Sequence, residues 1–425
     1  MRHKTYPGPN TIHRQELANG ITVLVYENFA AESVVIEGFV RAGSLAEGRA
    51  RAGLADFTAE MLLRGTSQRS FDEIYEVLES VGAVVDFASG RHTTDFSATS
   101  LAEDLDLALA LLAGSLREPT FPADELLKVQ GEILTSLQIR EHDTRQMAGL
   151  KFRELLYGEH PYGYSAQGYV DTIQALQRDD LVAFHRRHYG PQGMVIVLVG
   201  AVRAADGVAR VQAAFGDWTN PNWQAPPLAP DAPRPGAVQR LYHAIPDKTQ
   251  SDIVLGWPGP RRAAPDYMAA SVANTILGVF GMMGRLGKSV REKQGLAYYA
   301  FSRMQGGLGP SPWYVSTGVS PDKVEQALAS ILAEVDRLRD ELVPAGELAD
   351  TQAYRTGSLP VSLETNDGLA TVLADIELYE LGLDYLQRFP DLVNSVTPDQ
   401  VQAAARKYLS SSAVAIAVVG PPLDE

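Results

Sequence analysis

The sequence has 425 residues, of which 45% are hydrophobic, and this length is enough for two or more domains that each bury a core. Its formal net charge of −15 is spread along the chain without acidic or basic blocks, which argues against nucleic acid as a partner. The chain contains no cysteine, so any metal site would depend on His, Asp and Glu side chains.

No segment of the chain contains the roughly 20 apolar residues that a membrane-spanning helix needs. The N-terminal residues 1–13, MRHKTYPGPNTIH, also lack the apolar stretch that is typical of a signal peptide. We therefore expect a cytoplasmic protein without a membrane partner.

The first half of the chain alternates between β-rich and helical patterns. β-branched and aromatic residues predict strands over residues 21–27, 33–43 and 94–100, and apolar residues at helical spacing predict helices over 71–81 and 101–116. This mixture predicts an α+β sandwich, in which a sheet is covered by helices.

The second half repeats features of the first. Residues 180–189 (DLVAFHRRHY) precede an apolar strand at 194–200, and residues 399–408 (DQVQAAARKY) precede one at 414–420. The Asp and the Tyr that the two segments share are each separated by 219 residues. An internal duplication is the economical interpretation.

A proline-rich stretch, residues 219–236, divides the two halves and is typical of a semi-rigid linker. We expect two homologous domains, an N-terminal one at 1–218 and a C-terminal one at 237–425. Each is predicted to be a mixed sheet covered by helices, and the two sheets are expected to face each other across a cleft.

Residues 53–66 read GLADFTAEMLLRGT, which predicts a helix followed by a turn. This segment resembles the zinc-binding segment of the pitrilysin and insulysin family of peptidases, and particularly the branch that contains the mitochondrial processing peptidase. In that family an inverted motif, H-x-x-E-H, stands in a G-L-A-H-F-x-E-H-M-x-x-x-G-T setting. The resemblance extends from Asn19 to the last apolar strand of the chain.

Every position that the resemblance assigns to zinc chemistry is altered. In the family motif, two His residues on one helix face hold zinc, and the Glu before the second His activates the bound water. Here Asp56 replaces the first His, Ala59 the catalytic Glu and Glu60 the second His. Ser136 stands where the family has its third ligand, a Glu. We therefore expect no metal and no general base in this chain.

Several carboxylate and histidine side chains are candidates for a different metal site. Asp56 and Glu60 share a predicted helix face, but two carboxylates without a third ligand make a poor site for a hard cation. Glu132 adds only a single further ligand. His185 and His188 are spaced to chelate a metal, although a solvated basic helix face is the favoured interpretation.

Residues 277–299 read LGVFGMMGRLGKSVREKQGLAYY and match a second hallmark of the family, a glycine-rich loop followed by R-E-x-x-G-L-A-Y. The resemblance assigns Arg291 and Tyr298 to substrate positioning and transition-state stabilisation. An Arg offers forked donors to peptide carbonyls, and a Tyr hydroxyl donates to a developing oxyanion. In the structural alternative, Arg291 forms a salt bridge and Tyr298 packs in a strand. The loop glycines, which would allow close approach of a peptide, are Gly278, Gly281, Gly284 and Gly287.

In the bacterial two-subunit members of the family, one chain carries the zinc motif and the other carries the Arg/Tyr pair. The resemblance therefore implies a non-catalytic, substrate-positioning subunit of a heterodimeric zinc metallopeptidase. The implied partners are a peptide substrate and a homologous subunit with an intact H-x-x-E-H, which supplies the zinc and the general base. An isolated chain can also form a homodimer, because the surface meant for a homologous partner can be self-complementary.

Two alternative functions stay open. The first is a stand-alone peptide-binding or assembly protein that captures extended segments by strand addition, without proteolysis. The second is an active metallopeptidase that uses Asp56 and Glu60 in an atypical metal site.

Overall fold

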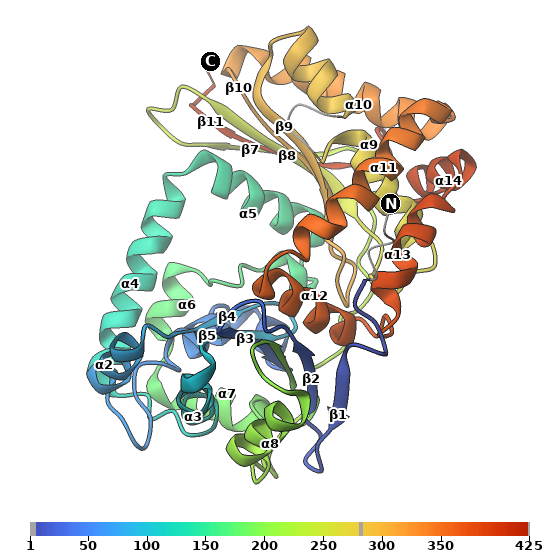
Figure 1. Ribbon diagram of the computed structural model, residues 1–425. Coiled ribbons are helices and arrows are strands. Elements are labelled where there is room, and N and C mark those ends of the chain that lie inside the picture. Colours follow the sequence, from blue (N-terminus) through green and yellow to red (C-terminus); the bar gives the residue numbers. More distant parts are fainter. Residues whose placement is uncertain (1–5, 280–283, 424–425) are drawn as a thin grey trace. The chain divides into compact units, whose positions relative to one another are not determined.

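The computed structural model describes residues 6–279 and 284–423. The chain forms two compact units (Figure 1). Unit 1 contains the residues up to 135 together with 165–227 and 359–388, and unit 2 contains 136–164, 228–358 and the residues from 389 onward. Among the described residues, no helix has the length and apolar character needed to cross a membrane.

Unit 1 is built on a mixed sheet of six strands in the order β1-β2-β6-β3-β5-β4. β2 and β6 run parallel, and the other neighbours run antiparallel. The strands are β1 (His13–Glu16), β2 (Thr22–Glu27), β3 (Ser33–Val40), β4 (Val84–Ser89), β5 (Thr94–Leu101) and β6 (Val195–Gly200). The helices are α1 (Leu54–Glu60), α2 (Phe71–Val81), α3 (Leu105–Arg117), α6 (Val170–Ala175), α7 (Arg178–His188), α8 (Ala204–Phe215) and α12 (Asn366–Leu378).

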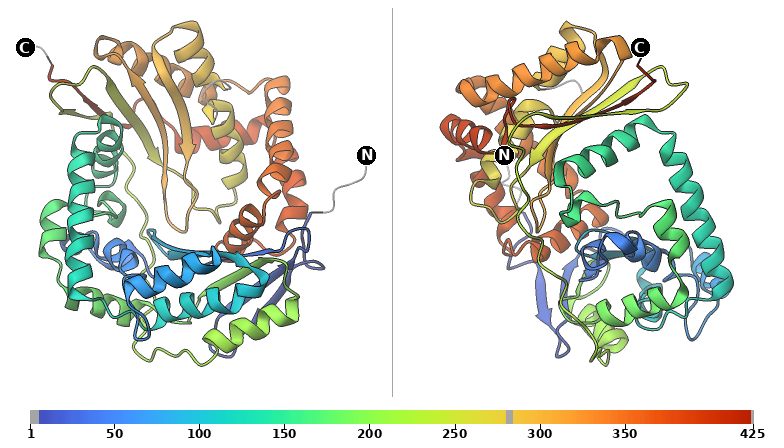
Figure 2. Two further views of the ribbon diagram at one scale, coloured as in Figure 1. Left: turned by 60° about the vertical axis from the view of Figure 1, so that its left-hand side comes forward. Right: turned by 180° about the vertical axis from the view of Figure 1, so that it is seen from behind.

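Unit 2 is built on a mixed sheet of five strands in the order β7-β11-β8-β10-β9, which can be followed in the turned views of Figure 2. β7 and β11 run parallel, and the other neighbours run antiparallel. The strands are β7 (Gln239–Ala244), β8 (Ser251–Pro258), β9 (Ala297–Met304), β10 (Pro312–Val319) and β11 (Ala415–Gly420). The helices are α5 (Thr144–Tyr157), α9 (Tyr267–Gly278), α10 (Val324–Asp340), α14 (Pro398–Tyr408) and a π-helix (Gly287–Lys293).

Three helices pass from one unit into the other. They are α4 (Ala123–Glu141), α11 (Ala345–Ser362) and α13 (Tyr385–Asn394). Residues 219–236, all of which the structure describes, form no helix or strand.

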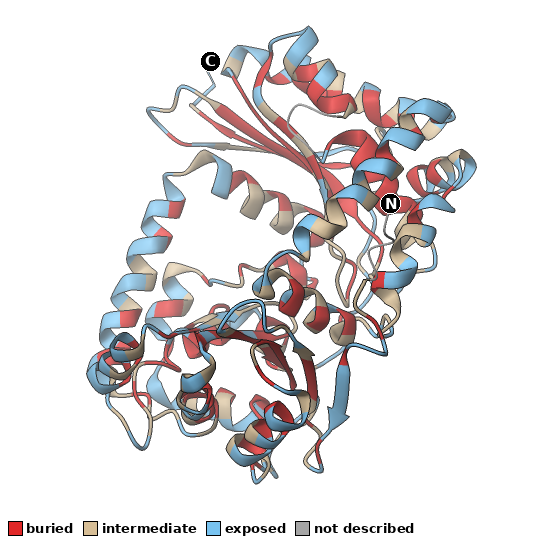
Figure 3. Cartoon of the chain, viewed as in Figure 1, coloured by how far each residue is buried: buried red, intermediate tan, exposed pale blue. Residues whose placement is uncertain are grey.

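Burial along the strands follows from how many of their faces are covered. β6 reads VIVLVG and is buried at every position, because helices cover both faces of the central part of the sheet (Figure 3). In contrast, β5 alternates between buried and less buried positions. On one face, α8 contacts β2 and α3 contacts β5, and on the opposite face α12 contacts β3 and β6.

The helix α12 belongs to the second half of the sequence but packs on the sheet of unit 1. Its apolar residues Leu369 and Leu373 recur at helical spacing and join Val35, Phe39 and Val197 of the sheet in one buried cluster. The side chain of Thr365 caps the helix by accepting a hydrogen bond from the backbone N–H of Gly368.

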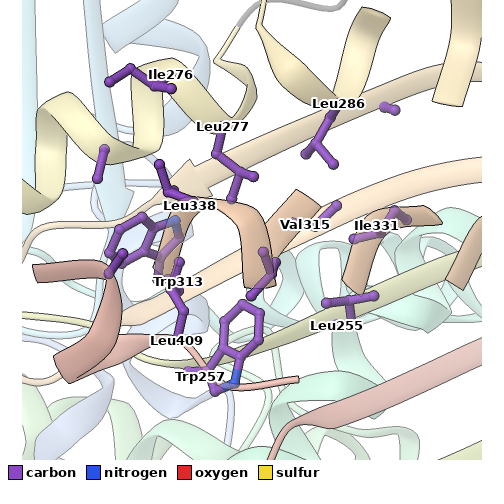
Figure 4. Packing of buried hydrophobic residues seen from close by; sticks show 14 of the residues in the cluster. Leu255, Trp257, Ile276, Leu277, Leu286, Trp313, Val315, Ile331, Leu338 and Leu409 are labelled. Atoms are coloured by element: carbon purple, nitrogen blue, oxygen red, sulfur yellow. The ribbon is translucent and has the colours of Figure 1, made fainter. Parts of the chain in front are cut away.

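The sheet of unit 2 is covered in the same way. On one face Trp257 of β8 and Trp313 of β10 lie in a buried cluster with residues of α9, α10 and α14 (Figure 4). On the other face α5, from the first half of the sequence, contacts β8 and β11. Its Phe152 lies 6.1 Å from the ring of Tyr314, and its Tyr157 hydroxyl donates to the Pro310 carbonyl at 2.7 Å.

These observations confirm the predicted α+β class and the duplication of a helix-covered mixed sheet. The strand order β2-β6-β3-β5-β4 matches β7-β11-β8-β10-β9, including the position of the parallel pair. The offset of 219 residues also places α5 on residues 363–376, which overlap α12.

The compact units differ from the expected domains at 1–218 and 237–425. The two halves exchange equivalent helices, so that α12 completes unit 1 and α5 completes unit 2. The physical reason is that each sheet has a second apolar face, and the helix that buries this face comes from the other half.

The exchange predicts that a cavity in α12 destabilises unit 1. Leu373 is fully buried, so Leu373→Ala should lower the free energy of unfolding by about 2–5 kcal/mol, measured by urea denaturation. Leu127→Ala on α4 is the matched control, because the Leu127 side chain is 67% exposed and its loss should change stability by about 0.5 kcal/mol or less. Equal costs for the two variants would contradict the packing of α12.

Candidate functional site

The helix of the first motif, α1, begins at a position that requires glycine. Gly53 has a φ of +96°, and a Cβ atom there would lie 2.6 Å from Cδ1 of Ile173. The carboxylate of Glu47 accepts hydrogen bonds from the backbone N–H of Gly53 at 3.0 Å and of Ala55 at 2.7 Å. Burial nevertheless raises the pKa of Glu47 to about 8. The first turn of α1 is therefore fixed by backbone geometry and by this buried carboxyl group.

Asp56 and Glu60 stand one helical turn apart on α1. Burial, followed by the neighbouring Glu60 carboxylate, raises the pKa of Asp56 to about 7. The pKa of Glu60 is also raised by burial, although Arg64 opposes this shift. Asp56 and Glu60 are thus two partly or largely buried carboxyl groups on one helix face, and each binds its proton more tightly than an exposed carboxyl group does.

The remaining positions of the first motif add no metal ligand. Ala59 is only 2% exposed and presents a methyl group where the family has its base. Ser136 is exposed on α4 and is the first residue of unit 2. The carboxylate of Glu132 binds the guanidinium of Arg64 at 3.0 Å. Among the described residues, no group of three His, Asp or Glu side chains is placed to hold a metal ion.

The interpretation of His185 and His188 as a solvated basic face is wrong. Nε2 of His185 is hydrogen-bonded to the carbonyl of Leu116 at 2.9 Å, and its ring stacks on Tyr189 with 4.7 Å between centroids. Burial lowers the pKa of His185 to about 4 and also lowers the pKa of His188. Both rings lie on the face of α7 that carries Leu181, which explains why they are buried.

The second motif begins in the last two residues of α9, and its Gly281 lies outside the described residues. The π-helix at 287–293 carries Arg291 and is fixed to the core of unit 2 by Val290, which is fully buried. Just before it, the guanidinium of Arg285 forms a two-point ion pair with Glu347, at 3.0 and 2.8 Å. Arg291 is itself half-buried. A π-helix is a feature often found at functional sites.

Tyr298 lies near the start of β9, which is an edge strand of the sheet of unit 2. Tyr299 pairs with Gly318 of β10, whereas Ala297 pairs with Val319, so Tyr298 is the extra residue of a β-bulge. Its side chain is 73% exposed, which contradicts the alternative that it packs within the strand. The strand and the π-helix contact each other, so the structure brings Arg291 and Tyr298 to neighbouring elements of one unit.

A buried polar cluster that the sequence patterns did not predict lies beside Tyr298. Asp252 of β8 is 1% exposed and accepts hydrogen bonds from the hydroxyl groups of Tyr299 and Thr144. The guanidinium of Arg145 lies 4.6 Å from the centre of the Tyr299 ring. The sequence did contain a signal for this cluster, because an acidic residue within the apolar segment SDIVLGWP needs hydrogen-bond donors when the strand is buried.

Two duplicated α+β units, one with an altered inverted zinc motif and one with an Arg/Tyr motif, define a two-domain protein of the inverted-zinc peptidase class. Comparison with known families agrees with this class: Insulinase (Peptidase family M16) matches residues 22–165, and the Peptidase M16 inactive domain matches residues 175–354. The chain is 30% identical over 430 residues to an uncharacterized zinc protease of Streptomyces coelicolor, covering 98% of this chain and 91% of the relative. This chain belongs to peptidase family M16.

Other relatives and structures are similar over nearly the whole chain. A probable mitochondrial-processing peptidase subunit beta of Arabidopsis thaliana is 24% identical, covering 96% of this chain and 78% of the relative. The crystal structure of a peptidase M16 inactive domain from Pseudomonas fluorescens is 27% identical with a TM-score of 0.89, covering 97% of this chain and 99% of that chain. A protease from Helicobacter pylori has a TM-score of 0.91 at 19% identity, which supports the fold alone, and covers 98% and 100% of the two chains.

The raised pKa of Asp56 predicts a pH-dependent effect of Asp56→Asn. Below about pH 4 the carboxyl group is neutral in both the folded and the unfolded chain. As the pH rises to about 7, only the unfolded chain ionises this group, so the wild-type protein loses stability in this window. The free energy of unfolding of Asp56→Asn relative to wild type should therefore rise between pH 4 and 7, measured by urea denaturation.

Glu73→Gln is a control of opposite sign for this experiment. Hydrogen bonds from the backbone N–H and the side chain of Ser70 lower the pKa of Glu73, so its ionised form stabilises the folded chain. Glu73→Gln should lose stability relative to wild type as the pH rises. A difference between wild type and Asp56→Asn that stays constant from pH 4 to 7 would contradict the burial of Asp56.

Proposed function

We propose that this chain is the non-catalytic, substrate-positioning subunit of a heterodimeric zinc metallopeptidase that acts on peptides in the cytoplasm. A homologous partner subunit with an intact H-x-x-E-H would supply the zinc and the general base. The observation that carries the proposal is an asymmetry: the zinc positions Asp56, Ala59 and Glu60 are altered, whereas Arg291 and Tyr298 are kept.

The geometry of the second motif supports a role at a peptide. The hydroxyl of Tyr298 stands on an exposed side chain that a bulge turns out of the strand, so it is accessible as a neutral hydrogen-bond donor. Such a donor stabilises an oxyanion as negative charge develops on a peptide carbonyl. The guanidinium of Arg291 offers a planar fork of donors that suits two oxygens of an extended peptide backbone.

The first test is peptide cleavage by this chain, by a homologue from the same genome with an intact H-x-x-E-H, and by their mixture. Activity on an unstructured fluorogenic peptide is expected only in the mixture. Tyr298→Phe and Arg291→Ala should each lower kcat in the mixture by roughly 100- to 1000-fold, which is the usual effect of removing one oxyanion donor.

Tyr75→Phe is the matched control for this test, because Tyr75 is an exposed tyrosine on α2 of unit 1. It should leave kcat unchanged. Peptide binding by the isolated chain without cleavage in any mixture would support the stand-alone binding protein instead. Zinc-dependent cleavage by the isolated chain would support an active enzyme with an atypical metal site.

A second test concerns the metal. The isolated chain should contain no stoichiometric zinc by elemental mass spectrometry, because its altered positions lack imidazole ligands and a third carboxylate. The combined variant Asp56→His, Ala59→Glu, Glu60→His and Ser136→Glu should bind about one zinc per chain. A folded combined variant without zinc would contradict the assignment of these four positions.

A further inference from the structure

We propose that Asp252 is a positioning residue that fixes the direction of Tyr298 by holding Tyr299 and, through it, the β-bulge at the start of β9. This inference rests on the proposed function for the role of Tyr298. It adds a second layer to the site, made of residues that would not themselves contact the peptide.

The bulge decides which residue of β9 enters the core. β9 alternates its faces, and Ala300 on the core face is fully buried. In a regular ladder Tyr298 would pair with Val319 and would point into the same apolar core. The bulge instead pairs the small Ala297 with Val319, and Ala297 is buried in that cluster. Tyr298 is turned outward because Ala297 takes its place.

The neighbouring Tyr299 locks this arrangement. Its hydroxyl reaches across β10 and donates a hydrogen bond to Oδ1 of Asp252 on β8. Gly318 pairs with both residues and stands between them, so the three form one row across the sheet. A Cβ atom on Gly318 would lie 2.7 Å from Cε1 of Tyr299 and 3.0 Å from Oδ1 of Asp252. The missing side chain of Gly318 is therefore what lets the phenol lie across the strand.

Asp252 is well suited to be a rigid anchor. Its carboxylate is 1% exposed, and a buried carboxylate is costly unless several donors satisfy it. Besides Tyr299, Oδ2 accepts from the Thr144 hydroxyl at 2.5 Å, and Nε2 of Gln250 lies 3.2 and 3.3 Å from the two oxygens. Burial, together with the Asp252 carboxylate, raises the pKa of Tyr299, so its phenol stays a donor.

The first residues of α5 belong to the same cluster. Thr144 supplies one donor, and the guanidinium of the next residue, Arg145, lies over the Tyr299 ring at 4.6 Å and over the Phe301 ring at 5.8 Å. The edge strand β9 would otherwise be held on one side by β10 alone. The first residues of α5 thus hold Tyr299 and Asp252 on one face of the sheet. Tyr298, the extra residue of the bulge, is left exposed.

The experiment measures Asp252→Asn and Tyr299→Phe, each with and without Tyr298→Phe, in the mixture with the zinc-motif homologue and an unstructured fluorogenic peptide. Tyr299 and Thr144 donate to different oxygens of Asp252, and Asp252→Asn replaces one of these acceptors by an NH2 donor, so one of the two hydrogen bonds is lost. Each single variant should lower kcat by roughly 10- to 100-fold with a nearly unchanged KM, because the hydroxyl of Tyr298 is misplaced. In the Tyr298→Phe background neither variant should lower kcat further.

A readout independent of activity is the ¹⁹F NMR signal of 3-fluorotyrosine placed at position 298. Its chemical shift should change in Tyr299→Phe and in Asp252→Asn, and the signal should become broader or split. Tyr242→Phe is the matched control, because Tyr242 is on β7 at the opposite edge of the same sheet and its hydroxyl donates to the Pro421 carbonyl. This control should change neither kcat nor the signal.

The outcomes separate the two proposals. An unchanged kcat in Tyr298→Phe would overturn the proposed function, while the ¹⁹F signal would still decide whether Asp252 positions residue 298. A normal signal at position 298 in both Asp252→Asn and Tyr299→Phe would overturn the positioning role, whatever the activity. Losses that add to those of Tyr298→Phe would also overturn it, because Asp252 would then act independently of Tyr298. If Asp252→Asn does not fold, Tyr299→Phe tests the positioning role by itself, because it removes only the hydroxyl group and keeps the ring.

Discussion

The structure depends on the burial of two sheet faces by helices that the opposite halves of the sequence provide. Each sheet is covered on one face by helices close to it in sequence, and on the other face by an exchanged helix, α12 in unit 1 and α5 in unit 2. The apolar strand residues under α12, such as Val35 and Phe39, would otherwise meet water. This requirement links the two halves of the duplicated chain into one structure.

The sequence predicts the class of fold well because its evidence is local. Strand patterns, the repeated Asp and Tyr positions and the proline-rich residues 219–236 follow from the properties of short segments. The exchange of helices does not follow from them. An amphipathic helix such as α5 shows that one of its faces must be buried, but its pattern is the same whichever sheet it covers. The compact units therefore differ from the expected domains.

The site shows the same limit at a smaller scale. The altered residues of the first motif and the Arg/Tyr pair can be identified from letters alone, whereas the bulge that exposes Tyr298 adds one residue to a strand and leaves no clear signature. The burial of the two α7 histidines and the buried Asp252 could have been predicted from the sequence. Leu181, Phe184, His185 and His188 recur at helical spacing, and Asp252 interrupts an otherwise apolar strand. The basic residues around His185 and His188 favoured an exposed helix face, although the spacing indicated burial. The apolar neighbours of Asp252 indicated a buried strand and drew no attention to its carboxylate.

The position of α12 in the chain also affects the order of events during synthesis. The last strand of unit 1 ends at Gly200, but α12 begins at Asn366 and ends at Leu378. At the usual 5–20 residues per second of translation, roughly 10 to 35 seconds separate these points. During this interval the nascent sheet has an apolar face with no helix of its own to cover it. The native burial of this face can therefore be completed only after α12, in the last quarter of the sequence, has been synthesised.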